Sequence, residues 1–69
     1  MARTYNYAMV FLPDGTSTDA EFYTYGRWTW GARLRGLRRW CERNGIVVKY
    51  PLAAMMGGNS WTAYDIANA

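Results

Sequence analysis

Between residues 27 and 45, the apolar positions repeat at the spacing of a helix. The segment reads RWTWGARLRGLRRWCERNG, and its apolar stripe recurs at i, i+4, i+7 and i+11, on Trp30, Leu34, Leu37 and Cys41. We predict a helix that begins near Thr29, an acceptable N-cap, and ends at Asn44 and Gly45, where glycine can adopt the left-handed conformation. Leu37, at the centre of the stripe, should be buried.

Two glycines, Gly31 and Gly36, lie inside this predicted helix. Each costs about 1 kcal/mol relative to alanine in a helix interior. Close approach of the helix to a sheet or to a partner would offset that cost. A poorly optimised helix is the alternative.

Upstream of the helix, the pattern is typical of a β-hairpin. Residues 4 to 12, TYNYAMVFL, are rich in aromatic and β-favouring side chains, and they run into PDGT at 13 to 16, which suits a tight turn. The return strand should cover residues 19 to 25. A capping box formed by Thr18 and Glu21 would instead start a helix there, but the run of alternating Tyr and Thr favours a strand.

Alternation along the two strands divides their side chains between two faces of a sheet. On the first strand, one face carries Tyr5, Tyr7, Met9 and Phe11, and the other carries Asn6, Ala8, Val10 and Leu12. A single helix can cover only one face. If the smaller side chains pack beneath it, an open aromatic platform remains, made of Tyr5, Tyr7, Tyr23 and Tyr25. Core packing of any one of these tyrosines is the alternative.

After the helix, residues 46 to 50, IVVKY, are predicted to form a short strand. Ile46, Val48 and Tyr50 would face inward and Lys49 outward, and the following proline would end the strand.

Two further elements are predicted near the C-terminus. Residues 52 to 60, LAAMMGGNS, suit one helical turn followed by a glycine loop, and residues 60 to 66, SWTAYDI, suit a last strand. The predicted order is β-β-α-β-β. We therefore expect an α+β fold in a single small domain, residues 1–69, with one helix packed on a small antiparallel or mixed sheet.

The composition favours residue types that dominate binding energy at interfaces. Four tryptophans, six tyrosines and two phenylalanines present more aromatic surface than a core of 69 residues is expected to cover. Tryptophan, tyrosine and arginine are the types most often found at interface hot spots. Some of these side chains should therefore remain on the surface.

Seven arginines accompany a single lysine, and the formal net charge is +3. Arg35, Arg39 and Arg43 would form a ridge on the outer side of the helix that could follow a phosphate backbone or an acidic groove. A solvated helix face, or the composition of a GC-rich genome, would give the same pattern. Arg33 is predicted to lay its stem on the ring of Trp40.

Most catalytic chemistry is excluded by what the chain lacks. Histidine is absent and Cys41 is the single cysteine, so zinc and cysteine-rich redox sites cannot be built. Asp19, Glu21 and Asp65 could meet on adjacent strands as a magnesium or acid–base site, although nothing in their spacing requires it. We predict no enzyme activity, no cofactor, no metal and no small-molecule substrate.

These patterns together predict a non-catalytic protein that binds a macromolecular partner. The residues predicted to bind it are Arg35, Arg38, Arg39, Arg43, Tyr5, Tyr7, Tyr23 and Tyr25. A protein partner, either heterologous or a second copy of the chain, is favoured because the net charge is low for a nucleic-acid binder. Direct nucleic-acid binding through the arginine helix and the tyrosine platform is the alternative.

The hairpin-plus-helix plan with its LPDGT turn resembles small accessory proteins of phages and mobile elements, which implies an accessory or inhibitor role. The stretches YAMVFL and YPLAAMM are too short to span a bilayer, and MARTYNY lacks the hydrophobic region of a signal peptide. The single cysteine fits a reducing compartment. We expect a cytoplasmic protein without membrane contact.

Overall fold

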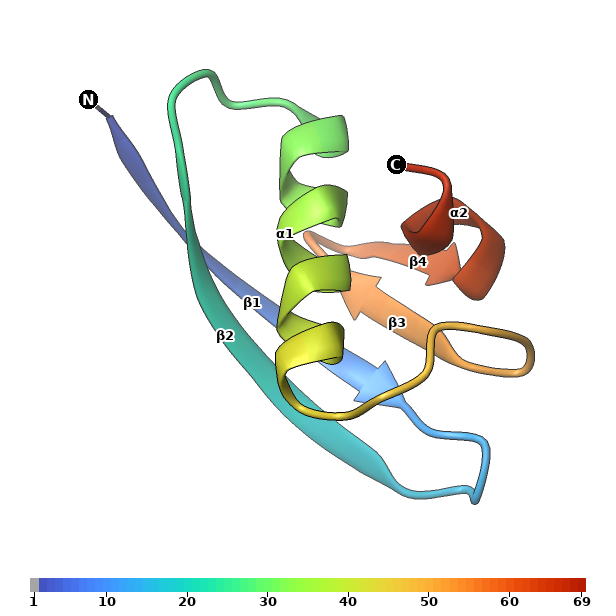
Figure 1. Ribbon diagram of the computed structural model, residues 1–69. Coiled ribbons are helices and arrows are strands. Elements are labelled where there is room, and N and C mark those ends of the chain that lie inside the picture. The colour runs from blue at the N-terminus through green and yellow to red at the C-terminus, as the bar shows by residue number, and fades with distance from the viewer. Residues whose placement is uncertain (1) are drawn as a thin grey trace.

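The computed structural model describes residues 2–69 as a four-stranded sheet with one main helix. The elements are β1 (Arg3–Phe11), β2 (Ser17–Tyr25), α1 (Trp30–Arg43), β3 (Ala53–Met56), β4 (Asn59–Thr62) and α2 (Ala63–Ala67). The sheet is antiparallel throughout, in the order β2-β1-β3-β4, and α1 lies across one face of it (Figure 1). The predicted α+β fold is confirmed, with a short second helix added at the C-terminus.

The β1–β2 hairpin forms as predicted, and its turn explains why. The Asp14 carboxylate accepts hydrogen bonds from the Thr16 backbone N–H, at 3.0 Å, and from the Thr16 hydroxyl, at 2.6 Å. Gly15 takes a φ of 90°, a conformation that costs glycine little. The two nine-residue strands then pair in one unbroken register. A strand, and not the alternative helix, therefore occupies residues 17 to 25.

The main helix also matches its prediction. Thr29 caps it, because its side-chain oxygen accepts a hydrogen bond from the Ala32 backbone N–H at 3.0 Å. Gly45, with a φ of 70°, follows its C-terminal end. The apolar stripe faces the sheet, and its buried members are Leu34, Leu37 and Cys41. Around them, the largest fully buried apolar side chains are Leu52, Met56, Ile66 and Val10.

Close approach to the sheet explains one of the two helix glycines. A Cβ atom on Gly36 would stand 2.7 Å from Cε2 of Phe22 and 2.9 Å from Cγ2 of Thr24. The helix therefore lies so near β2 that no side chain fits between them. Gly31 is different, since a Cβ there would meet only Nη1 of Arg35, at 3.3 Å, the mobile end of a long side chain.

These two glycines give a matched pair of substitutions. We expect Gly36→Ala to destabilise the protein by about 1–2 kcal/mol, because overpacking outweighs the gain in helix propensity. Gly31→Ala should instead stabilise it by up to about 1 kcal/mol. Urea titrations followed by far-UV circular dichroism measure both free energies of unfolding. If both alanines stabilise alike, the close contact between α1 and β2 is wrong.

The prediction of a strand at residues 46 to 50 is wrong. Residues 46 to 52 form a loop that carries the chain from the end of α1 around to the edge of β1 (Figure 1). Ile46 and Val48 pack against the core, as expected, but Tyr50 is 89% exposed instead of inward. Ile46 and Val48 therefore pack their side chains against the core from a loop, and their backbone does not pair with a strand.

The strand next to β1 comes from the following segment, where a helical turn was predicted. In β3, Ala54 and Met56 are buried and Met55 is exposed, so the segment alternates with the period of a strand. Gly57 and Gly58 both have positive φ, at 62° and 78°, and form the two-residue connection to β4. The sequence does contain a signal for this hairpin, because a pair of glycines, Gly57 and Gly58, between two short segments is typical of a hairpin turn.

The last strand was predicted at residues 60 to 66, and only the first half of that prediction is correct. β4 ends at Thr62, and the chain then turns into α2 through a capping box. The Asp65 carboxylate accepts a hydrogen bond from the Thr62 N–H at 2.9 Å, while the Thr62 hydroxyl accepts one from the Asp65 N–H at 3.2 Å. The T-x-x-D spacing that signals this cap is present in the sequence.

Candidate docking surface

The sheet face opposite α1 is open, and tyrosines gather on it. Tyr5 and Tyr7 project from β1, and Tyr23 and Tyr25 from β2, with exposed fractions of 53%, 45%, 49% and 60%. They lie on the same face because odd-numbered residues of the paired strands share it. We call this surface, defined by Tyr5, Tyr7, Tyr23 and Tyr25, the tyrosine face.

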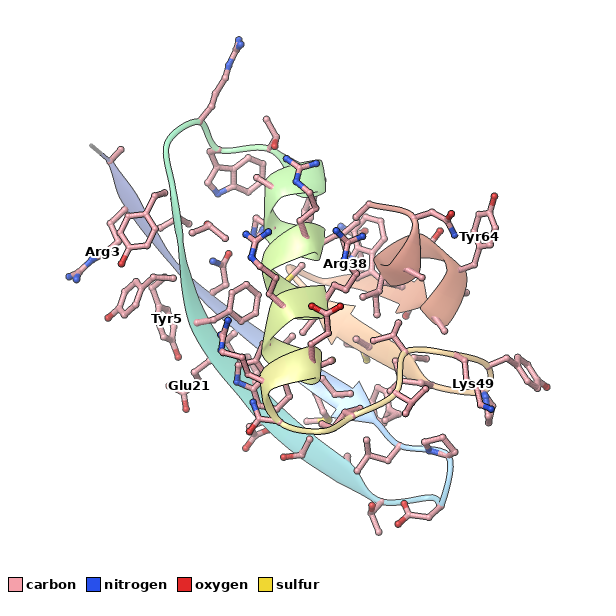
Figure 2. The ribbon with its side chains drawn as sticks, viewed as in Figure 1. Arg3, Tyr5, Glu21, Arg38, Lys49 and Tyr64 are labelled. Atoms are coloured by element: carbon pink, nitrogen blue, oxygen red, sulfur yellow. The ribbon has the colours of Figure 1, made fainter. Side chains whose placement is uncertain are left out.

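Two of the hydroxyl groups on the tyrosine face are held by carboxylates of β2. Tyr5 donates a hydrogen bond to Oε1 of Glu21 at 2.8 Å, and Tyr7 donates one to Oδ1 of Asp19 at 2.8 Å. Tyr5 and Glu21 project together from this side of the sheet in Figure 2. Each bond raises the pKa of its tyrosine above the ordinary value, because the neutral hydroxyl is the donor.

Ring contacts order the same surface further. The rings of Tyr5 and Tyr23 meet edge to face, with centroids 5.8 Å apart and an interplanar angle of 64°. The Arg3 guanidinium lies over the Tyr23 ring, 4.3 Å from its centroid. Three of the four tyrosines, Tyr5, Tyr7 and Tyr23, are therefore held by specific contacts. Exposed Phe11 and Met55 extend its apolar surface across to β3.

The predicted partner-binding arginines do not all have the same position. Arg35, Arg39 and Arg43 are exposed on α1, and we call them the arginine row. Arg38 instead is half-buried and contacts the C-terminal segment, between α1 and α2 (Figure 2). Its Nη1 donates hydrogen bonds to the carbonyl oxygens of Ala67, at 3.0 Å, and Ala69, at 3.2 Å. Arg38 therefore helps to fasten the end of the chain.

The arginine row and the tyrosine face are two separate surfaces. α1 covers one face of the sheet, and the exposed side of α1 points away from that sheet. The tyrosines occupy the other face. A flat partner surface cannot contact both at once. This separation is the arrangement expected from the sequence if the smaller side chains of the first strand pack beneath the helix.

The predicted stacking of Arg33 on Trp40 is wrong, and the actual contacts reveal a buried polar cluster. Nε of Arg33 donates a hydrogen bond to Oδ1 of Asn6 at 2.7 Å, and the guanidinium lies over the rings of Trp30 and Trp28 at 4.5 and 5.0 Å from their centroids. Burial lowers the pKa of Arg33.

Asn6 is fully buried at the centre of this cluster. Its Nδ2 donates to Oγ1 of Thr24 at 3.0 Å, and more weakly to the carbonyl oxygens of Thr4 and Phe22. Every polar atom of the Asn6 side chain is therefore satisfied. The sequence signal for this buried polar residue was its position on the face of the first strand that it shares with Ala8 and Val10.

The acidic residues do not form the metal site that was considered. Asp19 and Glu21 accept hydrogen bonds from tyrosines, and Asp65 caps α2 at another part of the fold. Within residues 2–69, no group of three metal-ligating side chains comes together. Cys41 is fully buried, and burial raises the pKa of its thiol, so the thiol is a core group.

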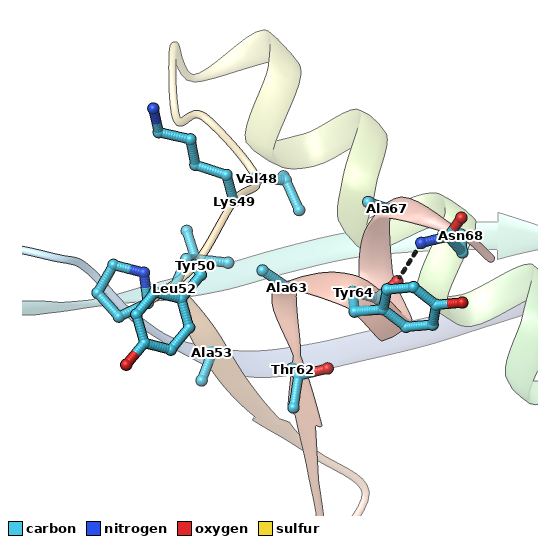
Figure 3. Close-up of a pocket in the computed structure, with 11 residues that line it drawn as sticks. Val48, Lys49, Tyr50, Leu52, Ala53, Thr62, Ala63, Tyr64, Ala67 and Asn68 are labelled. Atoms are coloured by element: carbon cyan, nitrogen blue, oxygen red, sulfur yellow. Dashed lines mark hydrogen bonds between the residues drawn. The ribbon is translucent and has the colours of Figure 1, made fainter.

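A pocket of about 500 Å³ lies between the 46–52 loop and α2 (Figure 3). Tyr50 and Tyr64, 89% and 75% exposed, stand on opposite sides of it, and its walls are mainly apolar. The Lys49 side chain extends away from Tyr64, so no cation points across the pocket. The sequence did not predict this pocket, because both of its walls belong to segments whose secondary structure was predicted wrongly.

Comparisons of the chain with protein-family models, with curated proteins and with solved structures give no match. Among the described helices, α1 and α2, neither is long and apolar enough to cross a membrane.

Proposed function

We propose that this protein is a non-catalytic binding module that docks on a protein partner through its tyrosine face. The observation that carries the proposal is the set of four exposed tyrosines on adjacent strands, two of them with hydroxyls held by Glu21 and Asp19. Docking of this kind is how an accessory protein or an inhibitor without a catalytic centre acts.

Ordering of the side chains before binding supports this choice of surface. Binding usually costs about 0.5–1.5 kcal/mol for each flexible side chain that becomes fixed. The hydrogen bonds of Tyr5 and Tyr7, and the ring contacts of Tyr23, already restrict these side chains in the free protein. Tyrosine is also enriched among interface hot spots. The tyrosine face therefore offers contact area at a reduced entropic cost.

The charges beside the tyrosines favour a protein partner over a nucleic acid. Asp19 and Glu21 lie on the tyrosine face and Arg3 at its end, so acidic groups outnumber the basic one. A phosphate backbone laid on this surface would meet like charge. A protein surface with lysine, arginine or amide groups is complementary to it.

Two double variants, matched in chemistry, test the proposal. Tyr5→Ser with Tyr23→Ser removes two rings of the tyrosine face, whereas Tyr50→Ser with Tyr64→Ser removes two exposed rings beside the pocket. Each bait is immobilised, and captured proteins are quantified after nuclease treatment of a source-cell lysate. We expect the first variant to bind the captured partner at least about 30-fold more weakly, equivalent to about 2 kcal/mol, and the second to bind like the parent.

The opposite pattern would contradict the proposal. Parental binding by the Tyr5→Ser, Tyr23→Ser variant, with its fold verified by circular dichroism, would remove the tyrosine face from the binding site. A further variant, Arg35→Gln with Arg39→Gln and Arg43→Gln, covers the nucleic-acid alternative. Capture that nuclease abolishes and that depends on this arginine row would assign the function to α1 and to phosphate contacts.

A further inference from the structure

The outer edge of β2 carries a complete set of unpaired backbone groups. β2 lies at the margin of the sheet and pairs only with β1. The hydrogen bonds from Leu12 N–H to the Thr16 carbonyl and from Gly26 N–H to the Ala2 carbonyl show that even-numbered residues point their backbone groups toward the hairpin partner. In an antiparallel pair, the alternate residues point away. In β2, the backbone N–H and C=O groups that point away from β1 belong to Ser17, Asp19, Glu21, Tyr23 and Tyr25.

This edge lacks most of the features that usually prevent strand pairing, and the charged side chains of Asp19 and Glu21 are the exception. Natural edge strands are shortened, bulged or furnished with proline or lysine. β2 has nine residues, an unbroken register with β1, and neither proline nor a basic residue. The opposite edge differs, because β4 has four residues and leads directly into α2. Among the described strands, none follows β2 on its outer side in the sheet order β2-β1-β3-β4.

We propose that the outer edge of β2 pairs antiparallel with β2 of a second copy of this chain, about a twofold axis. An antiparallel pairing of identical strands is self-complementary, so it closes as a dimer and leaves no further edge of the same kind. The two sheets then continue into each other, with both α1 helices on one side and both tyrosine faces on the other. The inference stands on the backbone of β2 and does not rest on the proposed function.

Avoidance of directly opposed carboxylates favours one register over another. With Phe22 on the axis, Glu21 lies opposite Tyr23 of the second copy, and Asp19 opposite its Tyr25, so neither carboxylate directly faces another carboxylate. With Glu21 on the axis, two carboxylates would face each other directly, which is unfavourable. Of these two registers, the one with Phe22 on the axis places both acidic residues of β2 opposite tyrosines.

Sedimentation velocity and hydrogen exchange test this together. We expect a monomer–dimer equilibrium, and in the concentrated sample a selective slowing of amide exchange at Asp19, Glu21 and Tyr23. The amides of Ala20 and Phe22, already bonded to β1, should be protected at every concentration. A protein that stays monomeric at about 1 mM overturns the proposal. So does a dimer in which the three outward amides exchange as in the monomer.

Substitutions at Tyr23 test whether this residue faces a carboxylate of the second copy, as the assigned register requires. Tyr23→Glu places a carboxylate opposite Glu21 of the second copy, twice in each dimer, and should weaken dimerisation roughly tenfold or more. Tyr23→Lys removes the same ring but places an ammonium group there, so dimerisation should be retained. Equal dimer constants for the two variants would overturn the assigned register. Capture of a heterologous partner is measured separately, so failure of the proposed function would leave the dimer result unaffected.

Discussion

Leu37→Ala is expected to lower the free energy of unfolding by about 2–5 kcal/mol. Leu37 is fully buried at the middle of α1, so the substitution removes apolar contact and leaves a cavity between helix and sheet. Small domains are stable by only about 5–15 kcal/mol, and one of this size should lie near the lower end. A substantial fraction of the protein would then be unfolded at elevated temperature.

Thermal melting followed by circular dichroism measures the effect, with Val47→Ala as the control. Val47 is 67% exposed in the loop after α1, so its truncation should change stability by no more than about 0.5 kcal/mol. For a domain of this length, 1 kcal/mol shifts the melting temperature by roughly 4–8 °C. A Leu37→Ala variant that melts together with Val47→Ala would show that the inner face of α1 is assigned incorrectly.

Asn6→Ala should destabilise the protein by about 1–3 kcal/mol, because buried polar groups lose their partners. Nε of Arg33 would lose its acceptor at 2.7 Å, and Oγ1 of Thr24 would lose its donor at 3.0 Å. The Arg33 guanidinium stays over the rings of Trp30 and Trp28, so part of its environment is retained in the variant. Urea titration measures the loss.

Thr24→Val serves as the graded control for this cluster. It keeps the shape of the side chain and removes one acceptor, while Nδ2 of Asn6 retains the carbonyl oxygens of Thr4 and Phe22. Its cost should therefore be clearly smaller than that of Asn6→Ala. Equal costs would mean that the Asn6–Thr24 bond, and not the contact with Arg33, gives the cluster its stability.

The first 45 residues were predictable because their local signals agree with their tertiary environment. The PDGT turn fixes the hairpin, alternation assigns each strand face, and the apolar stripe from Trp30 to Cys41 sets the buried side of α1. The cost of a glycine within a helix predicted a close approach at Gly31 or Gly36, but only the structure shows that it occurs at Gly36.

The C-terminal third was predicted less well because its elements are short and their propensities mislead. IVVKY has a strong strand propensity, yet it packs from a loop, while AAMM has a weak one and supplies β3. A strand of four residues gives too few positions for its period to be recognised. The sheet topology decides which of these two segments becomes the strand. The next strand must pair with the free edge of β1, and the chain reaches that edge only after the loop of residues 46 to 52.

For the candidate site, sequence periodicity predicted which tyrosines would share a face but not what they contact. The bonds of Tyr5 to Glu21 and Tyr7 to Asp19 depend on strand register, which the turn sets. Arg38 could not be distinguished from Arg35 or Arg39, since its acceptors lie in the C-terminal segment, about thirty residues away in the sequence. The pocket beside Tyr64 required the correct C-terminal fold.

Site-specific photo-crosslinking tests the central claim, docking through the tyrosine face, most directly. A photoreactive phenylalanine analogue replaces Tyr7 on that face, Arg39 in the arginine row, or Tyr64 beside the pocket, all exposed positions. Each protein is irradiated in nuclease-treated source-cell lysate, and the crosslinked products are separated by mass. We predict a discrete crosslink to a protein larger than this chain from position 7, and none from positions 39 or 64. A crosslink from position 39 or 64 with none from position 7 would contradict the account.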